Sequence, residues 1–169
     1  MNRETAKGSR KSPAGTATGQ CLCGRVHVEI TIPAFWAWHD HSHATRRAHG
    51  AAYATYIGCW RSRFRVAKGA EHLTRFEDPA TGDARTFCSL CGTPVAYARA
   101  RTPQVVNLPR ALFDGRTGRE PRYHIAIGDS PEWAYRCEKL KPLDGYPGVM
   151  WTGSRPRKLS AVPPQTFEQ

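Results

Sequence analysis

The sequence contains no run of about twenty apolar residues, the length that a helix needs to cross a bilayer. We therefore expect no membrane span. The first twenty residues also lack an apolar core, which argues against a secretory signal peptide. These absences predict a cytoplasmic protein in a reducing compartment, where close cysteine pairs hold metal ions more often than they form disulfides.

A convincing helical period is also missing from the sequence. Residues 25–32 instead alternate polar and apolar side chains, which places Val26, Val28, Ile30 and Ile32 on one face of a strand. Further short strand-like stretches follow, with thirteen prolines and fifteen glycines supplying turns between them. This pattern predicts a mostly β protein, built as a sandwich or a barrel.

Acidic residues are scarce, with 14 Asp and Glu against 25 Lys and Arg, a net charge of +11. Much of the excess lies near the ends of the chain. We predict a disordered basic tail at residues 1–19, one folded domain at residues 20–150 and an irregular basic tail at residues 151–169. Basic tails leave nucleic acid open as a partner, although no aromatic and basic RNA-binding pattern is present.

Two close cysteine pairs are the strongest motif. Cys21 and Cys23 open the folded region, Cys88 and Cys91 lie far downstream, and a glycine follows each pair. Four thiolates in a tetrahedral array select zinc or an iron–sulfur cluster, and zinc is the expected ion. Such a site is closed, so it would stabilise the fold by joining distant segments. Four buried free thiols are the alternative.

The chain resembles the glutathione-dependent formaldehyde-activating enzyme family, which includes centromere protein V. The resemblance covers about residues 19–150 and rests mainly on the motifs at residues 19–26, 46–50 and 85–94. It implies an Mss4-like folded β-sheet sandwich and one structural zinc on the four cysteines. It also implies carbon–sulfur lyase chemistry on an adduct of glutathione and formaldehyde.

The chain departs from the family at a second, catalytic zinc motif of three cysteines. Alignment on Arg46 and Gly50 places those cysteines at Asp40, Ser42 and Thr45. Hydroxyl groups stay protonated near neutral pH and are poor zinc ligands. The family's activity is therefore in question, and the alternative is a pseudoenzyme, a zinc-stabilised module that binds a partner without catalysis.

Two neighbouring groups could bind ligands. His39, His41 and His43 alternate, so in an extended strand they would share a face and could hold a second metal for a different metal-assisted reaction. Solvated histidines in a polar loop are the alternative. Arg46 and Arg47 could bind the carboxylate of a small thiol such as glutathione, or could be surface arginines without a ligand.

Overall fold

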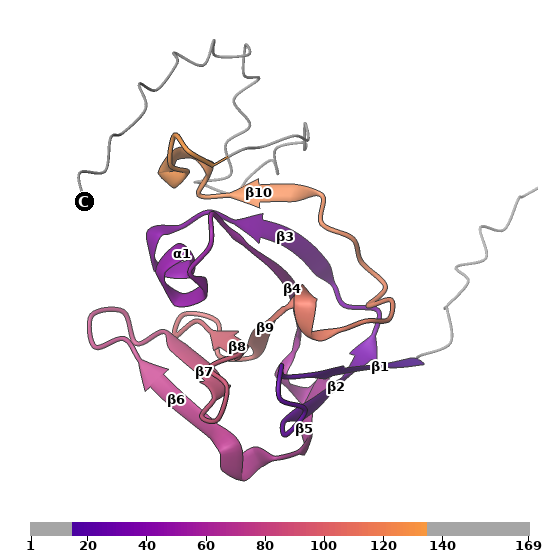
Figure 1. The fold of residues 1–169 in the computed structure, drawn as a ribbon. Helices are drawn as coiled ribbons and strands as arrows, with labels where there is room; N and C mark the ends of the chain where they lie inside the picture. The colour runs from indigo at the N-terminus through magenta and orange to yellow at the C-terminus, as the bar shows by residue number, and fades with distance from the viewer. Residues whose placement is uncertain (1–14, 135–169) are drawn as a thin grey trace, which may run out of the picture.

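A computed structural model describes residues 15–134 of the chain, and most regular structure in that range is β-strand (Figure 1). The prediction of a mostly β fold is therefore confirmed. Within these residues no helix has the length and apolar character needed to cross a membrane. Residues 1–14 and 135–169, which include the predicted C-terminal tail, lie outside the described residues.

The smaller sheet has three antiparallel strands in the order β1-β2-β5. They are β1 (Gly15–Gln20), β2 (His27–Ile32) and β5 (Phe64–Lys68). Strand β2 is the one expected from the alternation in the sequence, and its Val28 and Ile30 side chains are buried. The polar members of the alternation face outward.

Strand β1 corrects the predicted boundary of the N-terminal tail, because residues 15–19 pair with β2 rather than being disordered. Its inward positions are Ala17 and Gly19. A Cβ at Gly19 would lie 2.7 Å from the backbone oxygen of Leu112, so only glycine fits there without movement. Because the residues that β1 buries are so small, the strand has no hydrophobic signature in the sequence.

The larger sheet has seven strands in the order β10-β3-β4-β9-β8-β7-β6. Neighbouring strands from β3 to β6 in this order are antiparallel, and β10 pairs with β3 in parallel. The strands are β3 (Trp36–Asp40), β4 (Ala54–Trp60), β6 (Leu73–Glu77), β7 (Ala84–Cys88), β8 (Pro94–Ala98), β9 (Val105–Pro109) and β10 (Tyr123–Ile125).

One α-helix, α1 (His43–His49), follows β3, although the sequence predicted no helix. It begins after Ser42, whose side-chain oxygen accepts a hydrogen bond of 3.3 Å from the backbone nitrogen of Thr45. It ends at Gly50, which adopts the left-handed conformation with φ of 59°. Seven residues are too few to show a helical period, which is why the pattern analysis missed this helix.

The main hydrophobic core contains side chains from both sheets. Val26, Val28 and Ile30 pack there with Ile57 of β4 and Leu108 of β9. A second, smaller cluster borders the site described below. It consists of Trp38, Ala54, Tyr56 and Tyr97.

Candidate metal centre and adjoining cavity

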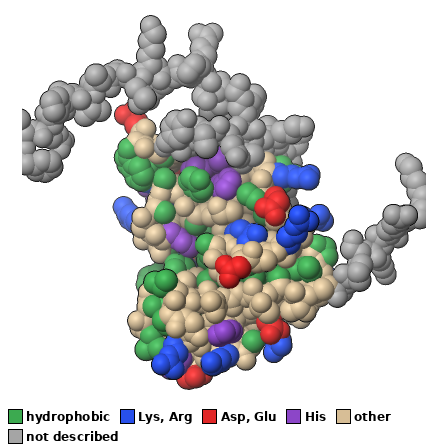
Figure 2. All heavy atoms as spheres, turned by 45° about the vertical axis from the view of Figure 1, so that its right-hand side comes forward, with side chains coloured by type: hydrophobic (Ala, Val, Ile, Leu, Met, Phe, Trp, Pro, Cys, Tyr) green, Lys and Arg blue, Asp and Glu red, His purple; other side chains and the backbone are tan. Residues whose placement is uncertain are grey.

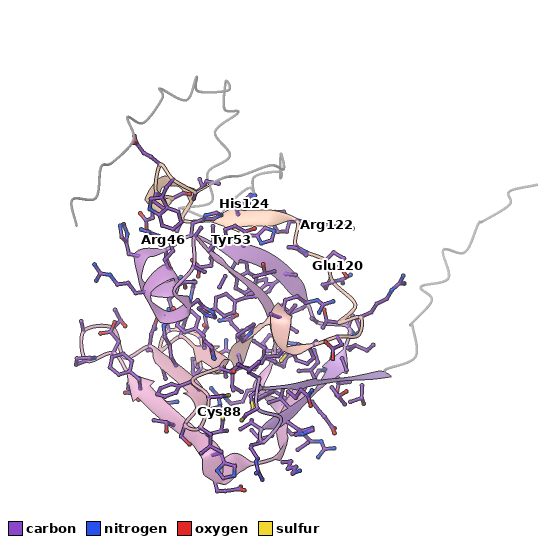
Figure 3. All side chains as sticks on the ribbon, viewed as in Figure 1. Arg46, Tyr53, Cys88, Glu120, Arg122 and His124 are labelled. Carbon is purple, nitrogen blue, oxygen red and sulfur yellow. The ribbon has the colours of Figure 1, made fainter. Side chains whose placement is uncertain are left out.

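The four cysteines of the two predicted pairs lie together. The turn between β1 and β2 carries Cys21 and Cys23, and the turn between β7 and β8 carries Cys88 and Cys91 (Figure 3 labels Cys88). All four Sγ atoms lie within 4.8 Å of one another. Each turn closes on a left-handed glycine, whose backbone N–H bonds the carbonyl of the first cysteine of the pair.

The sulfur positions fit a tetrahedral ion. Sγ of Cys23 lies 3.5 Å from that of Cys21 and 3.8 Å from that of Cys88. Zinc–sulfur bonds of about 2.3 Å in a tetrahedron place sulfur atoms roughly 3.8 Å apart, whereas a disulfide needs about 2.05 Å. The four thiols therefore have the spacing that zinc requires.

Hydrogen bonds from neighbouring groups favour the thiolate form of Cys21 and Cys91, whereas at Cys23 the backbone N–H of Arg25 is outweighed by desolvation and the neighbouring sulfurs, which raise its pKa to about 12. The backbone N–H of Val26 donates to Sγ of Cys21 at 3.3 Å. The hydroxyl of Thr93 lies 3.2 Å from Sγ of Cys91 and also accepts a bond of 3.1 Å from the N–H of Leu22. The Thr93 hydroxyl, and then its backbone N–H, lower the pKa of Cys91 to about 5. A thiolate is the form that binds metal.

An ion here would join the two sheets. The first pair belongs to a hairpin of the small sheet and the second to a hairpin of the large sheet. The cluster lies at the protein surface, because Cys23 is exposed while Cys21 and Cys88 are buried. Cys59 is 1% exposed in the main core, and burial raises the pKa of its thiol to about 11.

The three positions of the second family motif also lie together, bonded to one another. Both carboxylate oxygens of Asp40 accept hydrogen bonds, one from the backbone N–H of Ser42 at 2.9 Å and one from the Thr45 hydroxyl at 3.0 Å. Asp40 is 1% exposed and Thr45 is fully buried. The carboxylate is therefore engaged within the protein rather than directed at an open coordination position.

A polar chain that the sequence analysis did not identify extends from Thr45. Arg85 on β7 donates from Nη2 to the Thr45 hydroxyl at 3.3 Å and from Nη1 to the Tyr56 hydroxyl at 3.1 Å. The Tyr56 hydroxyl is also hydrogen-bonded to Nε2 of His49 at 2.7 Å. The guanidinium carbon of Arg85 lies 4.2 Å above the ring of Tyr97. These residues come from β7, β4, α1 and β8, so their spacing along the chain gave no signal.

Burial is the largest influence on the pKa values of His49 and Tyr56. Desolvation lowers the pKa of His49, and the nearby Arg85 cation lowers it further. Desolvation also raises the pKa of Tyr56, although Arg85 opposes that rise. Near neutral pH the uncharged forms of both side chains are therefore favoured.

A cavity of about 600 Å³ adjoins this hydrogen-bonded group, and Arg85, Tyr56 and His49 belong to its lining. Its polar and charged lining includes Arg47, His49 and Arg85 from the α1 and β7 side, and Asp78 and Asp83 from the loop between β6 and β7. Its remaining wall is largely apolar or aromatic and includes Phe76, Phe87, Pro94, Ala96 and Tyr97. The cavity thus has cationic, anionic and apolar surfaces.

The charged side chains that line this cavity differ in the partners that they have within the protein. Asp83 accepts hydrogen bonds from the Tyr97 hydroxyl at 2.6 Å and from the backbone of Ala100 at 3.0 Å. Arg85, by contrast, has no carboxylate within 4.0 Å among residues 15–134. The predicted arginine pair is divided: Arg47 lines the cavity, whereas Nε of Arg46 donates to the backbone oxygen of His41 at 3.2 Å.

The predicted histidine set does not share one strand, because β3 ends at Asp40 and His43 lies on α1. The reason is the Ser42 cap, which starts a helix where an extended chain was expected. His43 pairs with Asp129 at 3.3 Å on the surface. In the part of the chain described, only the four cysteines form a group of three or more metal-binding side chains by distance.

His39 and His41 instead contact His124 of β10. Nε2 of His41 lies 2.7 Å from Nδ1 of His124, and the ring centroids of His39 and His124 are 5.1 Å apart. Tyr53 packs on both His39 and His41 (Figure 3 labels Tyr53 and His124). This contact fixes the short β10 strand against the end of β3.

Basic side chains do not gather into a single patch on the face shown in Figure 2, where Lys and Arg are interspersed with Asp and Glu. Two of the acidic groups are paired with arginines, Glu29 with Arg65 and Glu77 with Arg75. The visible surface of the described residues therefore offers no continuous basic groove of the kind that follows a nucleic-acid backbone.

The chain is similar to one family of proteins and to solved structures. The family model described as glutathione-dependent formaldehyde-activating enzyme matches residues 16–129. The crystal structure of a Rhodobacter sphaeroides protein is similar, with a TM-score of 0.51 and 26% sequence identity, over 59% of this chain and 89% of that chain. No curated protein matches the sequence.

Proposed function

Because the chain belongs to the glutathione-dependent formaldehyde-activating enzyme family, we propose that it binds a glutathione-like thiol in the cavity beside α1 and holds a single structural zinc ion. The zinc ion is held by Cys21, Cys23, Cys88 and Cys91, in an Mss4-like arrangement of two sheets. No second metal binds at the positions where the family has a catalytic zinc.

The observation that carries this proposal is the placement of Arg85. Its guanidinium contacts Thr45, one of the three replaced ligand positions, and also lines the cavity. A fixed cation repels a divalent metal ion and attracts an anion through the same Coulomb term. The substitution of three thiols beside this arginine therefore changes the preference of the site from metal to anionic ligand.

The distribution of charge in the cavity suits a zwitterionic peptide. Arg85 and Arg47 can bind carboxylate groups, and Arg can do so with two parallel hydrogen bonds. Asp78 and Asp83 face the cavity from the opposite loop and can receive an ammonium group. Glutathione carries two carboxylates, one ammonium and one thiol. The volume of about 600 Å³ lies in the range typical of small-molecule sites.

Isothermal titration calorimetry with glutathione tests this proposal. We expect binding by the unmodified protein and at least tenfold weaker binding by Arg85→Gln, because one charge-assisted pair contributes roughly 1.5–3 kcal/mol. Arg75→Gln is the matched control, since Arg75 lies on the paired strand β6 but is absent from the cavity lining and pairs with Glu77. Absence of heat at millimolar glutathione, or equal affinity for both variants, would overturn the proposal.

A further inference from the structure

Tyr56 has an unusual position for a phenol, since it is only 1% exposed yet belongs to the lining of the cavity. Two nitrogen atoms hold its oxygen, Nη1 of Arg85 at 3.1 Å and Nε2 of His49 at 2.7 Å. A tyrosine in a core needs one hydrogen-bond partner to be satisfied. The second nitrogen, and the fact that one partner is a cation, need another explanation.

The donor inventory of these groups limits how the protons are arranged. Arg85 can only donate, so the Tyr56 oxygen accepts a hydrogen bond from it. When His49 carries its proton on Nδ1, the Tyr56 hydroxyl donates to Nε2. When His49 carries its proton on Nε2, the Tyr56 oxygen accepts from both nitrogens, and neither nitrogen takes up its own O–H.

The second arrangement is the one expected of a proton donor. A phenolate formed at Tyr56 would accept two N–H bonds, one of them from a cation, at a side chain that is only 1% exposed. Preorganised donors around a developing negative charge in such a site are an effective way to lower a reaction barrier. Desolvation of His49 favours its neutral form, so both tautomers are accessible near neutral pH.

We infer that Tyr56 is a general acid that protonates the carbonyl oxygen of an aldehyde during thiol addition in this cavity, with Arg85 and His49 as positioning residues for its hydroxyl oxygen. This inference rests on the proposed function, because the thiol must first bind in the cavity. It assigns the chemistry to side chains of α1, β4 and β7, and it requires no metal at Asp40.

The step balances as a simple addition. The bound thiol releases its proton to solvent, and the thiolate attacks the carbonyl carbon, forming a carbon–sulfur bond. The electron pair of the carbonyl π bond moves to oxygen, which takes the proton of Tyr56. The Tyr56 phenolate then regains one proton from solvent, so thiol and aldehyde give a hydroxymethyl thioether with no oxidant or reductant. The reverse sequence breaks the carbon–sulfur bond.

Exchange between glutathione, formaldehyde and their adduct, followed by NMR at equilibrium, tests the inference. We expect the unmodified protein to accelerate exchange above the uncatalysed rate and Tyr56→Phe to lose about 10²–10⁴-fold of that acceleration, as is typical of a missing general acid. Tyr56→Phe should still bind glutathione by calorimetry. Tyr53→Phe, a half-buried tyrosine absent from the cavity lining, should retain the full rate.

The outcomes separate this inference from the proposed function. If glutathione does not bind the unmodified protein, both fail together. If glutathione binds but exchange is not accelerated, or if Tyr56→Phe accelerates it as well as the unmodified protein, only the acid role of Tyr56 is overturned. A His49→Gln variant adds a readout of positioning: because His49 also lines the cavity, its rate should fall by a clearly larger factor than its affinity for glutathione.

Discussion

Nη2 of Arg85 donates a hydrogen bond of 3.3 Å to the hydroxyl of Thr45, and that hydroxyl donates in turn to the buried carboxylate of Asp40 at 3.0 Å. The hydroxyl thus links a cation in the cavity wall to an anion in the interior. A buried carboxylate is costly unless it is hydrogen-bonded and near a compensating charge. The link to Arg85 through Thr45 helps to satisfy that requirement without any metal ion.

Cys88→Ser should remove the zinc ion and most of the stability of the domain. Zinc binding to a four-thiolate site contributes on the order of 10 kcal/mol or more, which is comparable to the whole stability of a domain of this size. We expect about one zinc per chain in the unmodified protein by elemental analysis, close to none in the variant, and a thermal unfolding midpoint lowered by many degrees.

Cys59→Ala is the matched control for that experiment, because Cys59 is buried in the main core but does not belong to the group of four clustered thiols. Loss of its sulfur should cost roughly 1 kcal/mol and leave the zinc content unchanged. If Cys59→Ala lost zinc, or Cys88→Ser kept it, the metal centre would have to be placed elsewhere.

The cysteine cluster could be predicted from the sequence because its signal is local. Each pair lies in one tight turn, and the following glycine marks the left-handed residue that closes the turn. Strand β2 was predictable for the same reason, since alternation at residues 25–32 is visible without knowledge of any partner strand. In both cases, neighbours in sequence carry the information.

The cavity could not be predicted, because its polar residues become neighbours only through the sheet. His49 ends a helix that is too short to detect, and Tyr56 and Arg85 belong to strands that are not adjacent in the sheet order. In the motif at residues 85–94 the recognisable spacing belongs to Cys88 and Cys91, and nothing in the local sequence distinguishes Arg85. Arg85 is set apart by its contacts with Thr45 and Tyr56, which are distant in sequence, and not by the residues beside it in the chain.

Cysteines introduced at positions 40, 42 and 45, where the family has its catalytic zinc ligands, should reveal how strongly Arg85 weakens metal binding there. We expect the combined change Asp40→Cys, Ser42→Cys and Thr45→Cys to bind a second zinc ion weakly, since the guanidinium remains beside it. Adding Arg85→Gln should tighten that second site at least tenfold, because the change removes a like charge from its edge. Competition with a chromophoric zinc chelator measures both constants. Equal affinities with and without Arg85 would show that the arginine does not select against metal.

Lowering the pH should destabilise the folded domain partly through His49. Burial, and then Arg85, lower the pKa of His49 in the folded state, while the unfolded chain titrates near 6.5. The unfolded state therefore binds a proton that the folded state resists, and stability falls as the pH drops below about 6.5 until the folded-state pKa is passed. Arg85, Asp40 and Tyr56 are the charged or titratable groups that act on this ring or contact it.

Urea unfolding at several pH values between about 7.5 and 5.5 measures this effect, with the zinc site intact in every sample. Loss of zinc at low pH would lower stability as well, so the informative quantity is the difference between the unmodified protein and His49→Gln. We expect a shallower pH dependence in His49→Gln, because its folded and unfolded states bind the same number of protons at this position. His43→Gln changes an exposed histidine of the same helix that pairs with Asp129, and it should keep the steeper dependence of the unmodified protein. Identical slopes for the unmodified protein and His49→Gln would show that this ring binds protons equally in the folded and unfolded states, which would contradict a lowered pKa of His49 in the folded protein.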